Sequence, residues 1–575
     1  MNLKQQLDSI ISAGISETAG IADCQALINY ARDEKFGDYQ ANGIMGVAKQ
    51  LGKNPREFGE QVLDTLDLSG IAEKLELAGP GFINIHLAND FLSSALNTLI
   101  TSGQLIQNAE TLQTVVVDYS SPNLAKEMHV GHMRGTIIGD SLVRIFEHLG
   151  HTVIRQNHFG DWGTQFGMLI THMQDLHSAD TSLKNELADL EVFYRQAKER
   201  FDSDADFANA SRENVVKLQA GDAECLALWQ DFIKISMEHC EKLYALLGIT
   251  LSPDDIRAES FYNDKLAPVI ADLEAKALLT ESDGASCVFL EEFTSKDGTP
   301  LPVIVKKSDG GFLYATTDLA AIQYRNETLH ADRVLYVVDA RQSLHFQQIF
   351  KVAELADYKK QSCSLEHLSY GTMMGSDGKP FKTRSGGTVK LLDLVNEGVT
   401  RAHSLVADKN PDMQDAEKQA IAEVVGIAAI KYFELSKNRN SDYVFDWDTM
   451  LSFEGNTAPY LLYAYARIRS IFRKEEAANT ASFDISVIEK EEKALAIKLL
   501  QFTETVEQVA QDCFPNQLCL YLYELAGIYM RFYEACPVLK AQETVKNSRL
   551  GLCQLTALTI REGLNLLGID TLDKM

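Results

Sequence analysis

One stretch constrains the fold more than any other: residues 115–150, where a valine-rich run leads through a polar loop into an amphipathic helix. The valine run is typical of a buried strand, and apolar residues then recur at helical spacing from Ile138 to Leu149. Gly150 suits the position just after a helix end. The HVGH motif (His129–His132) lies where strand gives way to helix. We therefore expect its imidazoles and the free N–H groups of the helix start to face one anion, such as a nucleotide phosphate.

Two other interpretations of the histidine pair are open when it is taken alone. Two histidines three positions apart can simply line a helix start. They can also bind a metal, but a zinc site needs further Cys, His or carboxylate ligands at a regular spacing, and none flanks this pair. The pair alone therefore does not decide the chemistry.

Composition limits the class of protein. A chain of 575 residues is too long for one core and predicts roughly three or four domains. The nine cysteines form no CxxC pair and no regular pattern, so we expect reduced thiols in a cytosolic protein, with neither a structural zinc site nor a disulfide framework. No run of eighteen apolar residues and no signal peptide are present, so membrane insertion and export are not expected.

The net charge of -27 argues at first sight against a nucleic-acid partner, because phosphate binding depends mainly on Lys and Arg. A basic face can nevertheless coexist with acidic surfaces elsewhere. Each basic group in this chain also fits a solvated helix face. Three groups stand out: Lys379, Lys382, Arg384 and Lys390; Lys431, Lys437 and Arg439; Arg467, Arg469, Arg473 and Lys474.

The chain divides into three parts by pattern. Residues 1–110 combine helical patterns with a strand after a Gly-Pro-Gly turn (82–87), which predicts a small α+β domain. Residues 111–425 alternate strands and helices in the rhythm of a Rossmann-type parallel sheet, with a mostly helical insertion at about 176–285. We expect the sheet to resume after the insertion and to end near Gly371, with strands at 287–290, 302–306, 312–314, 334–338 and 365–370.

A basic, glycine-rich segment, Met373–Leu391, follows the sheet and lacks apolar periodicity. Such a segment is either an exposed linker or a mobile loop that closes over phosphates. From Leu392 onward strand patterns vanish, and residues 426–575 predict an α-helical bundle. We interpret most of its aromatic residues as core, with one or two exposed rings able to stack on unpaired bases.

The segment SPNLAKEMHVGH (121–132) resembles the HIGH signature of class I aminoacyl-tRNA synthetases, in the long form typical of arginyl-tRNA synthetases. LSFEGNTAPYLLYAYARI (451–468) and MRFYEACPVL (530–539) are similar to the DALR anticodon-binding domain of that family. The resemblance covers nearly the full chain. It implies an N-terminal domain that contacts the tRNA elbow and a monomeric cytoplasmic enzyme. Its substrates would be L-arginine, ATP with Mg2+, and tRNA; no zinc is implied, and arginine activation would require tRNA.

The resemblance also implies which residues act on ATP. His129 and His132 would contact the triphosphate, and Gly131 would let adenine approach the backbone. The segment FKTRS (381–385) departs from the KMSKS pattern of class I enzymes, since Arg384 stands where the second lysine is expected. Lys126, just before the histidines, would compensate, so the expected phosphate cations are Lys126, Lys382 and Arg384.

Arginine recognition requires carboxylates, because a guanidinium is always charged and presents a planar fork of donors. The family's arginine-site residues correspond to seven positions of this sequence. Tyr314 and Asp318 in YATTD and Gln342 in VVDARQSLH would bind the substrate, as would Glu259 and Asp118, while Ser121 and Asn123 would hold the amino-acid backbone.

Three alternatives to an arginine–tRNA ligase remain at this stage. Another class I synthetase shares the architecture, although a cysteinyl-tRNA synthetase would need a zinc-binding cysteine set. A simpler nucleotidyltransferase also uses paired histidines but does not need domains at both ends. A non-catalytic tRNA-binding paralogue usually loses a histidine or the substrate carboxylate, whereas this chain retains His129, His132 and Asp318.

Overall fold

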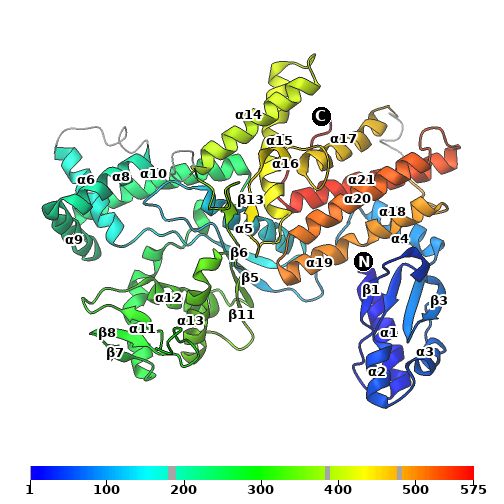
Figure 1. The fold of residues 1–575 in the computed structure, drawn as a ribbon, viewed down its shortest axis with the longest axis horizontal. Coiled ribbons are helices and arrows are strands. Elements are labelled where there is room, and N and C mark those ends of the chain that lie inside the picture. Colours follow the sequence, from blue (N-terminus) through cyan, green and yellow to red (C-terminus); the bar gives the residue numbers. More distant parts are fainter. Residues whose placement is uncertain (1, 179–188, 383–388, 475–481) are drawn as a thin grey trace. The chain divides into compact units, whose positions relative to one another are not determined.

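The computed structural model describes residues 2–178, 189–382, 389–474 and 482–575. They form two compact units (Figure 1). The HVGH motif belongs to the second unit. The first unit combines the described residues of Met1–Ala109 with those of Ser452–Leu566 and Asp570–Met575, and the second consists of Glu110–Leu451 and Leu567–Ile569.

A four-stranded parallel sheet with the order β11-β10-β5-β6 lies at the centre of the second unit. Val116 of β5 is paired with Val334 of β10 on one side and with Ile154 of β6 on the other. Branched apolar residues in adjacent positions are typical of strands buried on both faces. The strands are β5 (Thr114–Asp118), β6 (Thr152–Gln156), β10 (Arg333–Tyr336) and β11 (Ser364–His367). The predicted parallel, Rossmann-type sheet is confirmed.

The helices around this sheet fix the place of a ligand site. Helix α5 (Val130–His148) connects β5 to β6, whereas α13 (Ser343–Leu355) connects β10 to β11 in the opposite direction. One apolar cluster joins Val116 and Val334 to α11 (Asn263–Ala275), α12 (Tyr314–Glu327) and α13. In open α/β sheets, ligands bind beyond the carboxyl ends of the strands where the order reverses. In this sheet the reversal lies between β5 and β10.

The predicted insertion is helical over most of its described length. In α8 the buried residues Leu190, Phe193 and Ala197 recur at helical spacing, as the sequence pattern indicated. A short 3-10 helix, η3 (Glu259–Tyr262), leads back toward the sheet. The long helices are α6 (Thr164–Ser178), α8 (Leu190–Ser203), α9 (Ala205–Gln219) and α10 (Ala223–Leu247).

The prediction that the strands after the insertion continue the parallel sheet was wrong for the first three. Two of them fall in a separate antiparallel sheet of β7 (Thr280–Ser282), β8 (Ala285–Val288) and β9 (Val303–Lys306). The reason is local, because the two-residue turn Asp283–Gly284 has positive φ at both positions and forces adjacent strands to pair antiparallel. Phe312 forms only an isolated bridge, and Tyr314 already begins α12.

One further prediction about the segment after residue 392 needs correction. A two-residue strand, β13 (Tyr443–Val444), pairs in parallel with β12 (Met373–Met374), although no strand was expected there. Two residues are too few to show an alternating pattern. The boundary predicted at 425/426 falls inside α15 (Asp415–Leu435), and the chain stays in the second unit as far as Leu451. Helix α15 is buried on most sides, because it packs on α14 (Leu391–Lys409) and on α5.

The N-terminal part of the first unit is an α+β module, as predicted. Its antiparallel sheet has the order β1-β2-β4-β3, and the strand expected after the Gly-Pro-Gly turn is β4 (Phe82–Leu87). The other strands are β1 (Ile28–Tyr30), β2 (Tyr39–Ala41) and β3 (Ala72–Ala78). The helices are α1 (Leu3–Ala19), α2 (Ile44–Leu51), α3 (Pro55–Leu63) and α4 (Asn89–Ser102).

The C-terminal part of the first unit is helical. Most of its aromatic residues are core, such as Tyr521, Tyr529 and Phe532, whereas Tyr463 is 44% exposed. None of the described helices combines the length and apolarity needed to cross a membrane. All nine cysteines lie among the described residues, where they are buried and form no disulfide. The helices are α17 (Ala458–Lys474), α18 (Lys490–Leu500), α19 (Phe502–Asp512), α20 (Asn516–Ala535) and α21 (Glu543–Leu566).

Candidate active site at the HVGH motif

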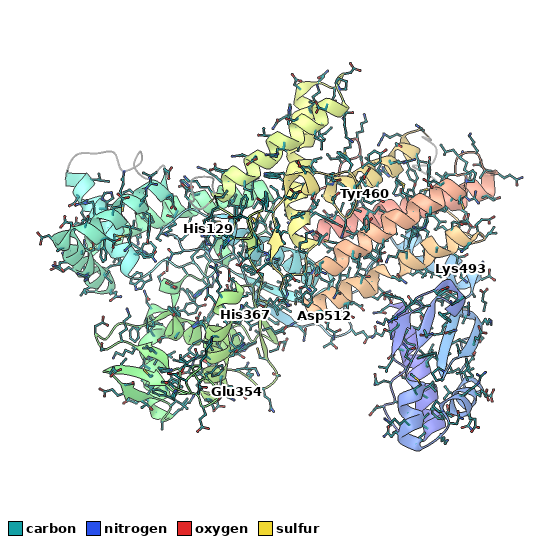
Figure 2. All side chains as sticks on the ribbon, in the orientation of Figure 1. His129, Glu354, His367, Tyr460, Lys493 and Asp512 are labelled. Carbon is teal, nitrogen blue, oxygen red and sulfur yellow. The ribbon has the colours of Figure 1, made fainter. Side chains whose placement is uncertain are left out.

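The HVGH motif begins α5 and supplies the cap of that helix. His129 is the N-cap residue, in extended conformation (Figure 2). Its Nδ1 accepts a hydrogen bond of 3.0 Å from the Gly131 N–H, and Nδ1 of His132 accepts one of 3.2 Å from the His129 N–H. Such a reciprocal capping box is usually built from Ser or Thr with Glu or Gln. Here two imidazoles perform it, with ring centroids 4.0 Å apart.

This arrangement corrects the expectation that free backbone N–H groups of the helix start face a phosphate. The Val130 N–H donates to the Val389 carbonyl at 3.1 Å, and the His132 N–H donates to the His129 carbonyl at 2.8 Å. The N–H groups of His129 and Gly131 are held by the imidazoles. A neutral imidazole that accepts at Nδ1 carries its proton on Nε2. The donors offered to an anion are therefore the two Nε2–H groups.

The structure gives a steric reason for a glycine at position 131, and it differs from the expected approach of adenine to the backbone. A Cβ at position 131 would lie 2.7 Å from Cε1 and 2.9 Å from Nδ1 of His129. Real Cβ atoms do not approach ring atoms so closely. The glycine is thus required for the His129 ring to fold over the helix start, whether or not a ligand also approaches the backbone there.

Both histidines are held in the neutral state. Burial, and then the proximity of His129, lowers the pKa of His132 to about 3. Burial also lowers the pKa of His129, against the opposing effect of Glu191. The motif therefore contributes hydrogen-bond donors but no positive charge near neutral pH. Neutralisation of a phosphate must come from other groups.

Two of the three expected phosphate cations are exposed in the structure. Lys126 is exposed in the loop that precedes HVGH, and Lys382 is exposed at the start of the basic segment. Arg384 lies outside the described residues. On one flank of the segment 383–388, the Phe381 N–H donates to the Met373 carbonyl at 2.9 Å.

The other flank of that segment is anchored at the HVGH motif. The Leu391 N–H donates to the Met128 carbonyl at 3.1 Å, next to the bond between Val130 and Val389. The described end of the basic segment thus lies directly beside the two histidines.

Asp118, at the carboxyl end of β5, does not lie open to a ligand. Its Oδ2 accepts a 2.7 Å bond from the Arg325 guanidinium, and its Oδ1 accepts a 2.8 Å bond from the Ser121 hydroxyl. Asp118 is 6% exposed and Arg325 is 1% exposed. The Ser121 hydroxyl also accepts from the His158 N–H at 2.9 Å. In this structure Asp118 and Ser121 hold this corner of the sheet, and their expected role as arginine ligands stays a prediction.

The loop between Asp118 and the motif has unusual backbone geometry. Ser120 and Ser121 have φ of 69° and 42°, in the left-handed region that side chains other than glycine seldom adopt. Their conformation brings Asn123 beside Gly160, where the Leu124 N–H donates to the Gly160 carbonyl at 3.0 Å. Asn123 is exposed, and only its Oδ1 is bound locally, by the Ala125 N–H at 2.9 Å. No hydrogen bond of its amide nitrogen is found among the described residues.

A second group of predicted residues gathers on α12 and α13. Tyr314 is 63% exposed at the first position of α12, and Asp318 follows one turn later on the same side. Nε2 of His345 lies 2.6 Å from Oδ2 of Asp318, and the His345 and Tyr314 ring centroids are 5.0 Å apart. Gln342 is exposed at the end of η4 (Ala340–Gln342), one turn before His345. An aromatic ring, a carboxylate and an amide thus share one surface.

Glu259 adds a carboxyl group from a different segment. Its N–H donates to the Phe159 carbonyl at 3.0 Å, which fixes the start of η3. Burial, followed by the nearby carboxyls of Asp161 and Asp318, raises the pKa of Glu259 to about 8. Asp161 is 3% exposed, and burial raises its pKa too, although it accepts bonds from the N–H and the hydroxyl of Ser260. The carboxyls of Asp161 and Asp318 thus lie close enough to Glu259 to disfavour its ionisation, and carboxyl groups gathered in this way suit a cation.

Comparison with known proteins decides the family. The model of the catalytic domain of class I (R) tRNA synthetases matches residues 95–447, the DALR anticodon binding domain matches 461–575, and the arginyl tRNA synthetase N terminal domain matches 5–87. The arginine–tRNA ligase of Marinomonas sp. (strain MWYL1) is 57% identical over 576 residues, covering 100% of this chain and 99% of that protein. The chain belongs to the arginyl-tRNA synthetases.

Solved structures of arginyl-tRNA synthetases share the fold. The enzyme of Plasmodium falciparum has a TM-score of 0.86 at 31% sequence identity, over 100% of this chain and 99% of that chain. The Thermus thermophilus enzyme has a TM-score of 0.83 at 26% identity, over 100% of both chains. The predicted class I catalytic fold, with an α+β domain before it and a helical domain after it, is confirmed.

Two residues of this arginyl-tRNA synthetase site escaped the sequence analysis. Asp161 stands in the glycine-rich turn FGDWG (159–163), where nothing in the sequence pattern distinguishes its buried carboxyl from a solvated one. His345 lies one turn after Gln342 and contacts Asp318. The pair is 27 positions apart, so only the tertiary structure reveals it.

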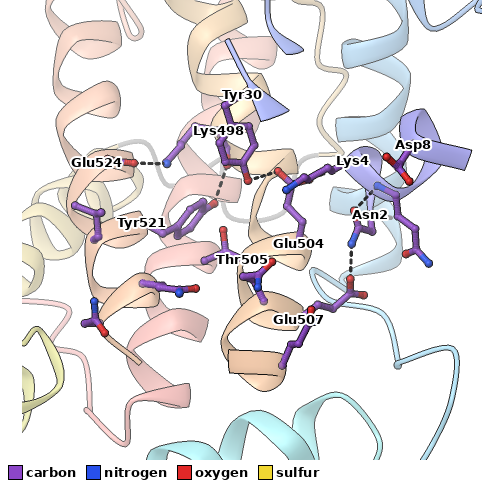
Figure 3. A pocket seen from close by; sticks show the side chains of 16 residues that line it. Asn2, Lys4, Asp8, Tyr30, Lys498, Glu504, Thr505, Glu507, Tyr521 and Glu524 are labelled. Atoms are coloured by element: carbon purple, nitrogen blue, oxygen red, sulfur yellow. Dashed lines mark hydrogen bonds and ion pairs between the residues drawn. The ribbon is translucent and has the colours of Figure 1, made fainter. Parts of the chain in front are cut away.

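One pocket lies elsewhere in this arginyl-tRNA synthetase. It has a volume of about 670 Å3 and lies where α1 and β1 of the N-terminal module meet α18, α19 and α20 (Figure 3). Glu504, whose pKa burial raises, accepts hydrogen bonds from the Lys4 N–H and from the hydroxyls of Tyr30 and Tyr39. These bonds join the module to the bundle. We therefore assign the pocket to the cohesion of the first unit and give it no ligand.

Proposed function

We propose that this chain is an arginine–tRNA ligase. The arginine carboxylate attacks the α-phosphorus of ATP, which forms arginyl-adenylate and releases pyrophosphate. The 2′-hydroxyl of the 3′-terminal adenosine of tRNA then attacks the arginyl carbonyl carbon and releases AMP. The observation that carries the proposal is that the carboxyl groups of Glu259 and Asp318 lie near each other, in the same unit as the two histidines that cap α5.

We infer that the activation step depends on positioning and charge stabilisation, since phosphoryl chemistry of this kind needs little covalent help from the protein. The Nε2–H groups of His129 and His132 would donate to phosphate oxygens as charge develops on them. Lys126, Lys382 and Arg384 would supply the positive charge that the neutral imidazoles lack. The hydrogen bonds of Val389 and Leu391 beside HVGH support this division, because Lys382 and Arg384 stand only a few positions before Val389 in the sequence.

We propose that the substrate guanidinium binds Asp318 and Glu259, with the Tyr314 ring and Gln342 beside them. Bidentate pairing with carboxylates suits a planar fork of N–H donors, and an aromatic face suits its delocalised charge. Asn123 would hold the amino-acid backbone through its side-chain amide. We propose that Asp118 and Ser121 support the end of β5, because the hydrogen bonds described above already engage both side chains.

Arginine binding is expected to release a proton from Glu259. The carboxyl is mostly protonated at pH 7 in the free enzyme, because its pKa is about 8, and a guanidinium beside it favours the carboxylate. The arginine Kd should therefore fall as pH rises toward 8 and level off above it. Isothermal titration calorimetry at pH 7, in buffers of different ionisation enthalpy, should detect a release that approaches one proton per arginine. Glu259→Gln should abolish that release; an unchanged release would assign the proton to another group.

Magnesium enters this proposal with ATP. The imidazole N–H donors and the Lys126 ammonium at HVGH suit phosphate oxygens rather than a metal, and the nearby carboxylates of Glu127 and Asp189 are paired with Lys390. Mg2+ keeps several of its waters and binds chiefly through substrate phosphates, where it would neutralise the pyrophosphate. We assign it no protein ligand.

We propose that residues 1–110 contact the tRNA elbow, that 111–425 catalyse both steps, and that 426–575 bind the anticodon region. In the structure, α15 and the chain as far as Leu451 belong to the same compact unit as the catalytic part. A single chain contains every residue proposed for the two substrate pockets, which supports a monomer. The family resemblance suggests a cytoplasmic enzyme that needs no membrane.

The proposal is tested by charging total tRNA with each of the twenty amino acids in the presence of ATP and Mg2+. Arginine alone should be attached. Charging with another amino acid would identify a different class I synthetase. Binding of tRNA without any charging would identify a non-catalytic paralogue.

A further inference from the structure

The cap of the insertion helix α8 reaches the residues that flank HVGH. The Asp189 carboxylate caps α8 by accepting from the Val192 N–H at 3.0 Å, and its other oxygen lies 3.1 Å from Nζ of Lys390. Lys390 also pairs with Glu127 at 3.2 Å. Two carboxylates, one from the insertion and one from the motif loop, thus share a single ammonium group. This bridge fixes the first turn of α8 beside the motif.

Two further residues of the same helix act on the motif. Nζ of Lys126 lies 4.3 Å from the centroid of the Tyr194 ring, well within the range of a cation–π interaction. The negative charge of Glu191 partly opposes the lowering of the pKa of His129 by burial, so Glu191 too lies close to the motif. The insertion therefore meets Lys390, His129 and Lys126 through one stretch of chain, the Asp189–Tyr194 segment.

We propose that Tyr194 is a positioning residue for Lys126 in the arginine-activation step. The inference deepens the proposed function and rests on it. A lysine side chain is a flexible four-carbon stem, and much of its rotamer entropy is lost when it is fixed on a phosphate. An ammonium that already rests on a ring face loses less freedom when ATP arrives. Tyr194 thus keeps Lys126 near the phosphate site before the nucleotide binds.

The chemical nature of the partner distinguishes the two lysines beside the motif. Lys390 is bound by two carboxylates, which neutralise its charge and occupy its donors. An aromatic face holds an ammonium through its quadrupole but removes none of its charge. Lys126 therefore keeps both its charge and its N–H donors for the phosphates. Glu127 and Asp189 serve to hold Lys390, and through it the two segments, together.

The test compares Tyr194→Leu with Tyr194→Phe in tRNA charging at varied ATP and varied arginine concentrations. Removal of the ring should lower kcat/KM for ATP about 2- to 5-fold, a range typical of an exposed cation–π interaction, and should leave KM for arginine unchanged. Tyr194→Phe keeps the ring and should restore the wild-type value. Arg195→Leu changes an exposed residue on the same turn and serves as the matched control.

A double-mutant comparison separates positioning from a merely structural effect. In a Lys126→Met background, Tyr194→Leu should cause no further loss, because the ammonium it positions is gone. An equal loss in both backgrounds, or a Tyr194→Leu enzyme that matches Tyr194→Phe, would overturn the inference while the wild type still charges arginine. A wild type that charges no arginine would instead contradict the proposed function.

Discussion

His132→Asn is expected to lower kcat for arginine charging about 100- to 1,000-fold, with little change in thermal stability. The asparagine side-chain oxygen takes the place of Nδ1 and can still accept the His129 N–H, so the helix cap survives. The Nε2–H donor is lost. Removing one donor aimed at developing negative charge costs roughly 3–4 kcal/mol of transition-state stabilisation. Single-turnover charging and a thermal melt of the same preparation measure the two effects.

The matched variant is His132→Gln, whose side-chain nitrogen reaches toward the Nε2 position but whose shape removes the Nδ1 acceptor. It should retain more activity than His132→Asn and should lose about 0.5–2 kcal/mol of stability, the usual effect of a lost cap. The activity of the wild-type enzyme should show no titration of His132 between pH 6 and 8, because the pKa of His132 is about 3. If His132→Asn charged at the wild-type rate, Nε2 would not be the donor.

Much of the fold was predictable from the sequence, because the residues that indicate its strands and helices lie close together in the chain. The valine run of β5 and the helical spacing in α5 follow from residues close in sequence, and so does the strand after the Gly-Pro-Gly turn. The antiparallel pairing of β7 and β8 was also encoded locally, in Asp283–Gly284, but the alternation of strands and helices around it pointed to a parallel sheet. The two-residue strand β13 is too short to leave a pattern.

The residues of the candidate site could be proposed from the sequence, but their orientation could not. Sequence placed two histidines at a helix start, yet only the structure shows that each Nδ1 is engaged in the cap. The pairing of Asp118 with Arg325, 207 positions away, could not be read from the sequence. The raised pKa of Glu259 depends on its burial and then on Asp161 and Asp318, which come from other segments. Such long-range pairings are set by tertiary packing and leave no periodic trace.

Asp318→Asn is expected to raise KM for arginine about 100-fold or more and to leave KM for ATP nearly unchanged. Loss of one partner of a desolvated, hydrogen-bonded charge pair typically costs 2–5 kcal/mol, and in this enzyme that partner would be the guanidinium of the substrate. The asparagine can still accept a hydrogen bond from His345, so the local structure should persist. Steady-state charging at saturating tRNA, with each substrate varied in turn, provides the measurement.

The control is Glu327→Gln, which removes an exposed carboxylate from the far end of the same helix and should leave KM for arginine at the wild-type value. A second consequence follows from the coupling between Asp318 and Glu259. Because the Asp318 carboxyl helps to raise the pKa of Glu259, Asp318→Asn should lower that pKa, so that Glu259 is more often ionised before arginine arrives. Proton release on arginine binding at pH 7 should then decrease. An arginine KM that does not change would exclude Asp318 from the guanidinium pocket, and an unchanged proton release would show that the two carboxyls do not share one pocket.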